Sequence, residues 1–133
     1  MEMKLELVPV PVADVDRAKS WYADKAGFDL NVDVRPNDEM RVVQFTPPGS
    51  ACSIVFGTGM PEISEMTPGS QKALHLVVKD IDAARAELTG RGVDVDDVID
   101  FGGVKYAHFA DPDGNTWLLQ QFPSDYVPGE APS

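Results

Sequence analysis

One stretch of this sequence occurs twice, as Val12-Ala13-Asp14-Val15-Asp16-Arg17-Ala18 and again, 66 residues later, as Val78-Lys79-Asp80-Ile81-Asp82-Ala83-Ala84. Two further matches follow in the same order at an offset of 65, first Gly27 with Gly92 and then Pro47-Pro48-Gly49 with Pro112-Asp113-Gly114. Ordered matches at a nearly constant offset, close to half of the 133 residues, indicate that the chain consists of two homologous modules.

The repeat also predicts where the modules begin and end. We expect module one at residues 1–57, a linker at 58–71 and module two at 72–123. Pro and Gly recur in the remaining segment, 124–133, which is therefore expected to be a flexible tail.

Each module is expected to contain one helix. Asp14 and Asp80 stand at N-cap positions, where a carboxylate accepts hydrogen bonds from the free N–H groups of the first turn. Val15, Ala18 and Tyr22 then recur at the spacing of a buried helical stripe.

The same pattern reading predicts four strands in each module. An apolar strand precedes each helix, residues 28–34 alternate between apolar and polar, and hairpins are expected at 41–56 and 104–122. The predicted fold class is α+β, with two tandem βαβββ modules.

Composition excludes several kinds of partner. The chain has 22 Asp and Glu against 11 Lys and Arg, a net charge of −11, which argues against nucleic acid and against an anionic membrane surface. Its single cysteine, Cys52, excludes an internal disulfide. With no recognisable signal peptide and no apolar run of about 20 residues, we expect a cytoplasmic protein without membrane association.

The stretch Phe109-Ala110-Asp111-Pro112-Asp113-Gly114-Asn115-Thr116-Trp117 is the most specific motif. Together with the repeated helix openings, it resembles the vicinal oxygen chelate superfamily, which includes glyoxalase I, extradiol dioxygenases, and fosfomycin and bleomycin resistance proteins. The resemblance extends from Leu5 to Phe122. It implies that the sheets curl into a half-barrel cavity, and that the protein forms a homodimer with its cavities at or near the interface.

The resemblance also implies where metal ligands would lie. Metal-dependent members hold a divalent cation with His and Glu from four strands, and these positions align with Leu7, Ser53, Ala73 and Leu118. Because none of these residues is a His or a carboxylate, we predict that the protein has no metal and no cofactor.

The two histidines of the sequence are expected to have different surroundings. His75 lies two residues after Ala73, so on an alternating strand it shares the cavity face. His108 is interpreted as a histidine on a sheet face or at the surface. An iron site made of His75, His108 and Glu6 is disfavoured, because Glu6 is out of phase with Leu7.

The sequence therefore predicts a protein that binds a small molecule without metal, similar to the bleomycin resistance branch. The expected ligand is planar, partly apolar and neutral or cationic, and no catalytic residue is identified. Apolar walls with a few polar groups are typical of ligand sites. The predicted lining is Leu7, Pro9, Ser53, His75, Leu118 and Gln120.

Two enzyme alternatives stay open at this point. The first is a metal-dependent lyase, isomerase or dioxygenase resembling glyoxalase I, which would require a divalent transition metal. The second is a metal-free enzyme in which His75 acts as a general base.

Overall fold

Residues 1–125 of the chain, the part that a computed structural model describes, form two four-stranded sheets, each with one α-helix. Most of the predicted tail, 126–133, lies outside the described residues. The elements are β1 (Leu7–Pro9), α1 (Val15–Asp24), β2 (Asp29–Asn37), β3 (Met40–Thr46), β4 (Ser53–Thr58), the 3-10 helix η1 (Ile63–Glu65), β5 (Leu74–Val77), α2 (Ile81–Gly90), β6 (Ile99–Phe101), β7 (Val104–Ala110) and β8 (Thr116–Gln121).

The two sheets have the same topology, β1-β4-β3-β2 and β5-β8-β7-β6. In each sheet the first strand pairs in parallel with the last, with Leu7 opposite Ser53 and His75 opposite Leu118. The remaining neighbours are antiparallel. The predicted α+β fold with two tandem βαβββ modules is confirmed, although the sheets do not close into a barrel.

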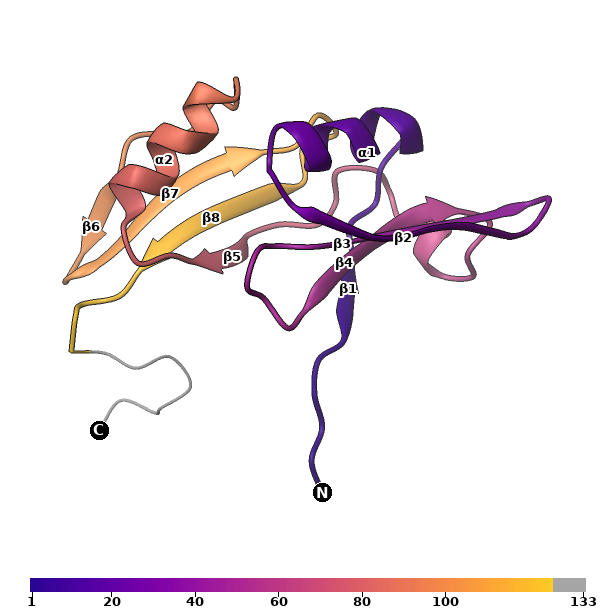
Figure 1. The fold of residues 1–133 in the computed structure, drawn as a ribbon, viewed down its shortest axis with the longest axis horizontal. Coiled ribbons are helices and arrows are strands. Elements are labelled where there is room, and N and C mark those ends of the chain that lie inside the picture. Colours follow the sequence, from indigo (N-terminus) through magenta and orange to yellow (C-terminus); the bar gives the residue numbers. More distant parts are fainter. Residues whose placement is uncertain (126–133) are drawn as a thin grey trace.

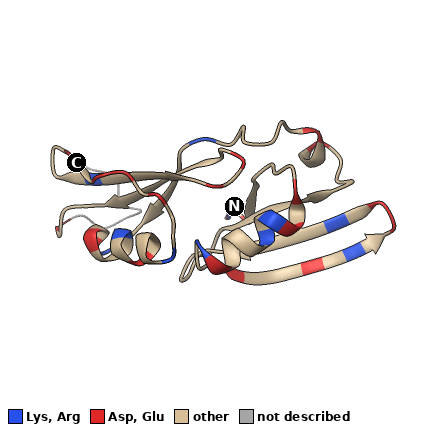
Figure 2. Ribbon diagram, turned by 90° about the horizontal axis from the view of Figure 1, so that it is seen from above, with Lys and Arg blue, Asp and Glu red and all other residues tan. Residues whose placement is uncertain are grey.

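The sheets lie side by side and carry their helices on the same side, so that α1 covers the first sheet and α2 covers the second (Figure 1). Acidic and basic residues are spread over both modules, as the view from above shows (Figure 2). No helix within residues 1–125 is long and apolar enough to cross a lipid bilayer.

Both helices begin as the sequence predicts. The carboxylate of Asp14 accepts a hydrogen bond from Arg17 N at 3.0 Å, and that of Asp80 accepts one from Ala83 N at 3.0 Å. Both caps precede an apolar stripe, and in α1 this stripe is buried at the predicted positions Val15, Ala18 and Tyr22. Local capping and periodicity are sufficient to start these helices.

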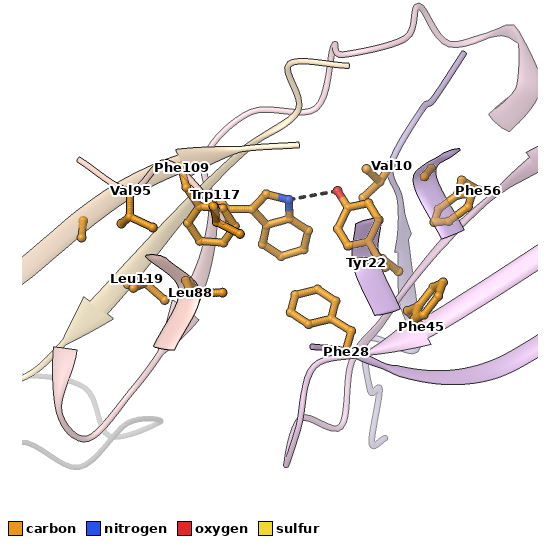
Figure 3. Packing of buried hydrophobic residues seen from close by; sticks show 14 of the residues in the cluster. Val10, Tyr22, Phe28, Phe45, Phe56, Leu88, Val95, Phe109, Trp117 and Leu119 are labelled. Carbon is orange, nitrogen blue, oxygen red and sulfur yellow. Dashed lines mark hydrogen bonds between the residues drawn. The ribbon is translucent and has the colours of Figure 1, made fainter. Parts of the chain in front are cut away.

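A polar joint connects the two modules at the turn between β7 and β8. One carboxylate oxygen of Asp111, Oδ2, accepts hydrogen bonds from Tyr22 Oη at 2.7 Å and from Asn115 Nδ2 at 2.8 Å. Tyr22 in turn accepts a hydrogen bond from Trp117 Nε1 at 3.1 Å (Figure 3). Because Tyr22 is buried and lies beside the Asp111 carboxylate, the pKa of its hydroxyl is raised well above the ordinary range.

The same turn also contacts the start of α1. Asp113 Oδ1 accepts hydrogen bonds from Ala13 N at 3.1 Å and from Arg17 at 2.9 Å, and Asn115 Nδ2 donates to Pro11 O at 2.8 Å. The turn that is the most specific motif in the sequence therefore holds module two against the beginning of the helix in module one.

Candidate functional site

The candidate site lies on the face of the second sheet that is opposite α2, called here the open face. Trp117 and Leu119 of β8 point into the core on the helix side of the sheet, so the alternating residue Leu118 points to the open face. A cavity of about 330 Å³ lies on this face and is called here the open-face hollow. Its lining is His75, Asp96, Asp97, Ile99, Phe101, Tyr106, His108 and Leu118.

Aromatic rings form one wall of this hollow. The rings of Phe101 and Tyr106 meet at a centroid distance of 6.1 Å, and His75 meets Tyr106 edge to face at 6.0 Å. Phe101 keeps 67% of its surface exposed although it is a large apolar residue. An exposed aromatic wall beside a cavity is a surface on which a flat ligand can pack.

Three hydrogen bonds or ion-pair contacts orient the polar groups of the hollow. His75 Nδ1 lies 2.7 Å from Ala73 O, and because a carbonyl only accepts, Nδ1 carries the proton. In the neutral ring Nε2 is then an acceptor. Tyr106 Oη accepts a hydrogen bond from Gln120 Nε2 at 3.2 Å, and His108 Nδ1 lies 3.4 Å from Asp96 Oδ2.

The structure separates the predicted site residues into two groups. His75 and Leu118 line the open-face hollow, and Gln120 contacts it through Tyr106. Leu7, Pro9 and Ser53 lie on β1 and β4 of the first sheet. Among the cavities formed by residues 1–125 that are described here, none is lined by residues of this second group. A single chain therefore does not assemble the predicted lining in one place.

The aromatic wall was not predicted from the sequence. Tyr106 and His108 are two residues apart on β7, so they lie on the same face of the sheet. This spacing was a signal in the sequence that could have predicted Tyr106 on the face that carries His108. Phe101 follows the acidic residues Asp94, Asp96, Asp97 and Asp100 and lies on the short strand β6, whose three residues are all exposed. Ile99 and Phe101 alternate with Asp100, but a strand of three residues is too short for its alternation to be recognised in the sequence.

The register corrects one of the four predicted metal positions. Leu7 and Ser53 are paired in the first sheet as His75 and Leu118 are in the second, so His75, not Ala73, is the equivalent of Leu7. Ala73 precedes β5 with a φ of 60°. The alignment was wrong because the connection from strand to helix is two residues shorter in module two, which changes the offset of the first strand.

The corrected set does not fit a metal centre. Leu7 and Leu118 have no donor atom, and the Ser53 hydroxyl lies 2.7 Å from Thr46 Oγ1, which leaves His75 as the one imidazole or carboxylate at the four positions. Within residues 1–125, no three His, Cys, Asp or Glu side chains are placed so that they could hold a metal ion.

A second and larger cavity, of about 530 Å³, runs between the modules beside β5 and α2 and is called here the intermodule groove. Its apolar lining includes Phe28, Leu76, Leu88, Phe109 and Leu119. The turn between β3 and β4 forms part of its rim.

Tandem βαβββ modules with an open sheet face are the architecture of the vicinal oxygen chelate proteins. The chain belongs to the Glyoxalase/Bleomycin resistance protein/Dioxygenase superfamily, whose model matches residues 4–119. The predicted resemblance is confirmed. No curated protein matches the sequence.

Several solved structures share this fold. TnmS3, an antibiotic binding protein from Streptomyces sp. CB03234, is 38% identical, with a TM-score of 0.78 over 92% of this chain and 98% of that one. A glyoxalase/bleomycin resistance protein from the same organism is 39% identical, with a TM-score of 0.75 over 89% of this chain and 100% of that one. A superfamily member from Sphaerobacter thermophilus DSM 20745 is 27% identical, with a TM-score of 0.77 over 90% and 98% of the two chains.

Proposed function

We propose that this protein binds a planar, partly apolar small molecule, neutral or cationic, without a metal ion, in the manner of the antibiotic-binding members of its superfamily. The observation that carries the proposal is the open-face hollow, where the exposed ring of Phe101 and the partly buried ring of Tyr106 lie beside His75. The identity of 38% to an antibiotic binding protein supports the same class of ligand.

The charge of the hollow supports a neutral or cationic ligand. Asp96 and Asp97 line the hollow, and among the described residues no Lys or Arg lines it. Asp97 is paired with Arg85 at 3.4 Å, and Asp96 contacts His108, so both carboxylates have partial partners. With a net charge of −11 over the whole chain, the surrounding field favours the approach of cations over anions.

The functional unit that we propose is a homodimer. The open-face hollow of a single chain is lined by module two alone, while Leu7, Pro9 and Ser53 belong to the corresponding face of module one. In the proposed dimer, module one of a second copy faces the hollow and closes it. This arrangement would bring the two groups of predicted lining residues together.

Replacing His75 by Ala is expected to weaken ligand binding roughly tenfold, because the ligand loses a hydrogen bond to Nε2 worth about 1–1.5 kcal/mol. Calorimetric titration with bleomycin and with a panel of planar aromatic cations measures the Kd. Glu39→Ala, in the exposed turn between β2 and β3, is the control and should leave the Kd unchanged.

Two results would contradict this proposal. Wild-type protein that binds none of the probes would argue against a site for planar molecules. An unchanged Kd in His75→Ala, with the far-UV circular dichroism spectrum preserved, would show that the site lies elsewhere.

Metal independence is a separate prediction, which rests on Leu7, Ser53 and Leu118 at three of the four ligand positions. Protein prepared in metal-supplemented medium should contain well under one transition metal ion per chain, as measured by inductively coupled plasma mass spectrometry. Chelator should not change its Tm, because no binding energy is linked to folding. Stoichiometric metal whose removal lowers the Tm would instead favour the metal-dependent lyase, isomerase or dioxygenase.

A further inference from the structure

The carbonyl that accepts the hydrogen bond from His75 is held in place by its own backbone. Ala73 has a φ of 60°, in the left-handed region that few non-glycine residues adopt. Its N–H donates to Thr116 Oγ1 at 2.7 Å, and its C=O accepts from His75 Nδ1 at 2.7 Å. The proton of the neutral imidazole therefore stays on Nδ1, and Nε2 remains an acceptor in the open-face hollow.

The hydroxyl of Tyr106 is the complementary group, a donor. Tyr106 and Gln120 are opposite each other on β7 and β8, and Gln120 Nε2 donates to Tyr106 Oη at 3.2 Å. Among residues 1–125, no acceptor takes the proton of this hydroxyl. A hydroxyl that accepts one hydrogen bond still has its own proton to donate, and the accepted bond makes it a better donor.

One flat ring can contact both groups. The rings of His75 and Tyr106 have centroids 6.0 Å apart, and Phe101 meets Tyr106 at a centroid distance of 6.1 Å. A ligand ring that packs against this wall is therefore within reach of the imidazole and of the hydroxyl. A ligand with acceptors alone would leave Nε2 without a partner, and one with donors alone would leave the hydroxyl without one. Either loss costs free energy once water is excluded.

The carboxylates of the hollow have partners in the protein. Asp96 Oδ2 lies 3.4 Å from His108 Nδ1, and Asp97 Oδ1 lies 3.4 Å from a guanidinium nitrogen of Arg85. Both aspartates are also exposed, so water and these partners satisfy them whether or not a ligand is present. The choice of ligand is therefore argued from His75 and Tyr106.

We propose that the open-face hollow selects planar lactams, flat rings in which an N–H donor and a carbonyl acceptor are neighbours on one edge. The lactam N–H donates to His75 Nε2, and the lactam carbonyl accepts from Tyr106 Oη. The inference rests on the ligand-binding function proposed above. It adds the chemical class of the ligand and makes Tyr106 a residue that determines specificity.

Calorimetric titration with two isosteric pairs of compounds tests this selectivity. Carbostyril and isocarbostyril are bicyclic lactams, and coumarin and isocoumarin are the lactones in which a ring oxygen replaces the N–H. In the wild-type protein at least one lactam should bind about tenfold more tightly than its lactone, because the ring oxygen is an acceptor that would face Nε2. Equal affinity of lactam and lactone in both pairs would overturn the proposal.

Two variants separate the roles of the polar groups. In His75→Ala the preference for lactam over lactone should fall below about threefold, because the acceptor is removed. In Tyr106→Phe both members of a pair should bind about tenfold more weakly with their ratio preserved, because both carry the carbonyl. A preference that persists in His75→Ala, or unchanged lactam affinity in Tyr106→Phe, would overturn the proposal.

A third variant and a third kind of probe serve as controls. Phe101→Ala removes apolar packing surface alone, so it should weaken binding of every probe and leave the ratio of lactam to lactone affinity unchanged. Indole has an N–H but no carbonyl, so its Kd should be the same for Tyr106→Phe and wild type. A circular dichroism spectrum that matches the wild type in each variant confirms that the fold is retained.

The outcomes also separate this inference from the ligand-binding proposal. A protein that binds the planar cations or the lactones without preferring a lactam would overturn the inference and leave ligand binding supported. A protein that binds no probe of any kind would contradict the ligand-binding proposal itself, and the inference with it.

Discussion

Replacing Asp111 by Ala is expected to lower the free energy of unfolding by about 3–5 kcal/mol, the cost of removing one partner from a buried charged network. The side chain is buried, with 6% of its residue surface exposed. Besides Tyr22 and the Asn115 amide, its second oxygen, Oδ1, accepts hydrogen bonds from the backbone N–H groups of Asp113 and Asn115, each at 2.9 Å. In the Ala variant these donors lose their acceptor in a place where water has little access.

Urea unfolding followed by circular dichroism measures this loss. Asp97→Ala is the matched control, because the Asp97 side chain is fully exposed in the same module and its removal should change stability by less than about 0.5 kcal/mol. Asp111→Asn should fall between the two, since its amide oxygen can still serve the two backbone donors. A loss below about 1 kcal/mol in Asp111→Ala would show that the joint does not hold the modules together.

Trp117→Ala should destabilise the protein by about 3–5 kcal/mol as well, through the cavity left by a buried indole. Trp117 is 2% exposed and packs among rings from both modules. It stacks on Phe109 at a centroid distance of 6.3 Å and meets Tyr22 and Phe28 edge to face at 6.0 and 5.4 Å (Figure 3). The substitution also leaves the Tyr22 hydroxyl without its indole donor.

Phe101→Ala is the control for this second variant, since it removes an aromatic ring from the same module. Because Phe101 is mostly exposed, its loss should change the midpoint of urea unfolding little, while it should weaken binding of a planar ligand. Comparable destabilisation in the two variants would contradict the assignment of Trp117 to the core between the modules.

The metal positions show where a repeat in the sequence stops being informative. The helix caps Asp14 and Asp80 are 66 residues apart, and this offset made Ala73 the equivalent of Leu7. Strand pairing makes His75 the equivalent residue, because backbone hydrogen bonds to β8 set the register and the connection that follows is shorter. An alignment that assumes a constant offset does not reveal a change in the length of the connection between a strand and the next helix.

The motif at Asp111–Asn115 shows a second limit of prediction from the sequence. Its residues predict a type I turn between two strands, and the turn is present. The side chains of Asp111 and Asp113 also accept hydrogen bonds from Tyr22, Ala13 and Arg17 of the other module, and these contacts depend on the packing of segments 89 to 100 residues apart. The local sequence around the turn therefore does not predict that contact.

The sequence by itself determined the class of fold, the order of elements in each module and the starts of both helices, because capping, periodicity and turns depend on neighbouring residues. Tertiary structure decided which residues share a site. The predicted lining divides between two sheets, with Leu7, Pro9 and Ser53 on one and His75, Leu118 and Gln120 on the other. The aromatic wall of Phe101 and Tyr106 joins the second group. Alternation along a strand shows that residues share a face, but the direction in which that face points is set by the packing of one module on the other.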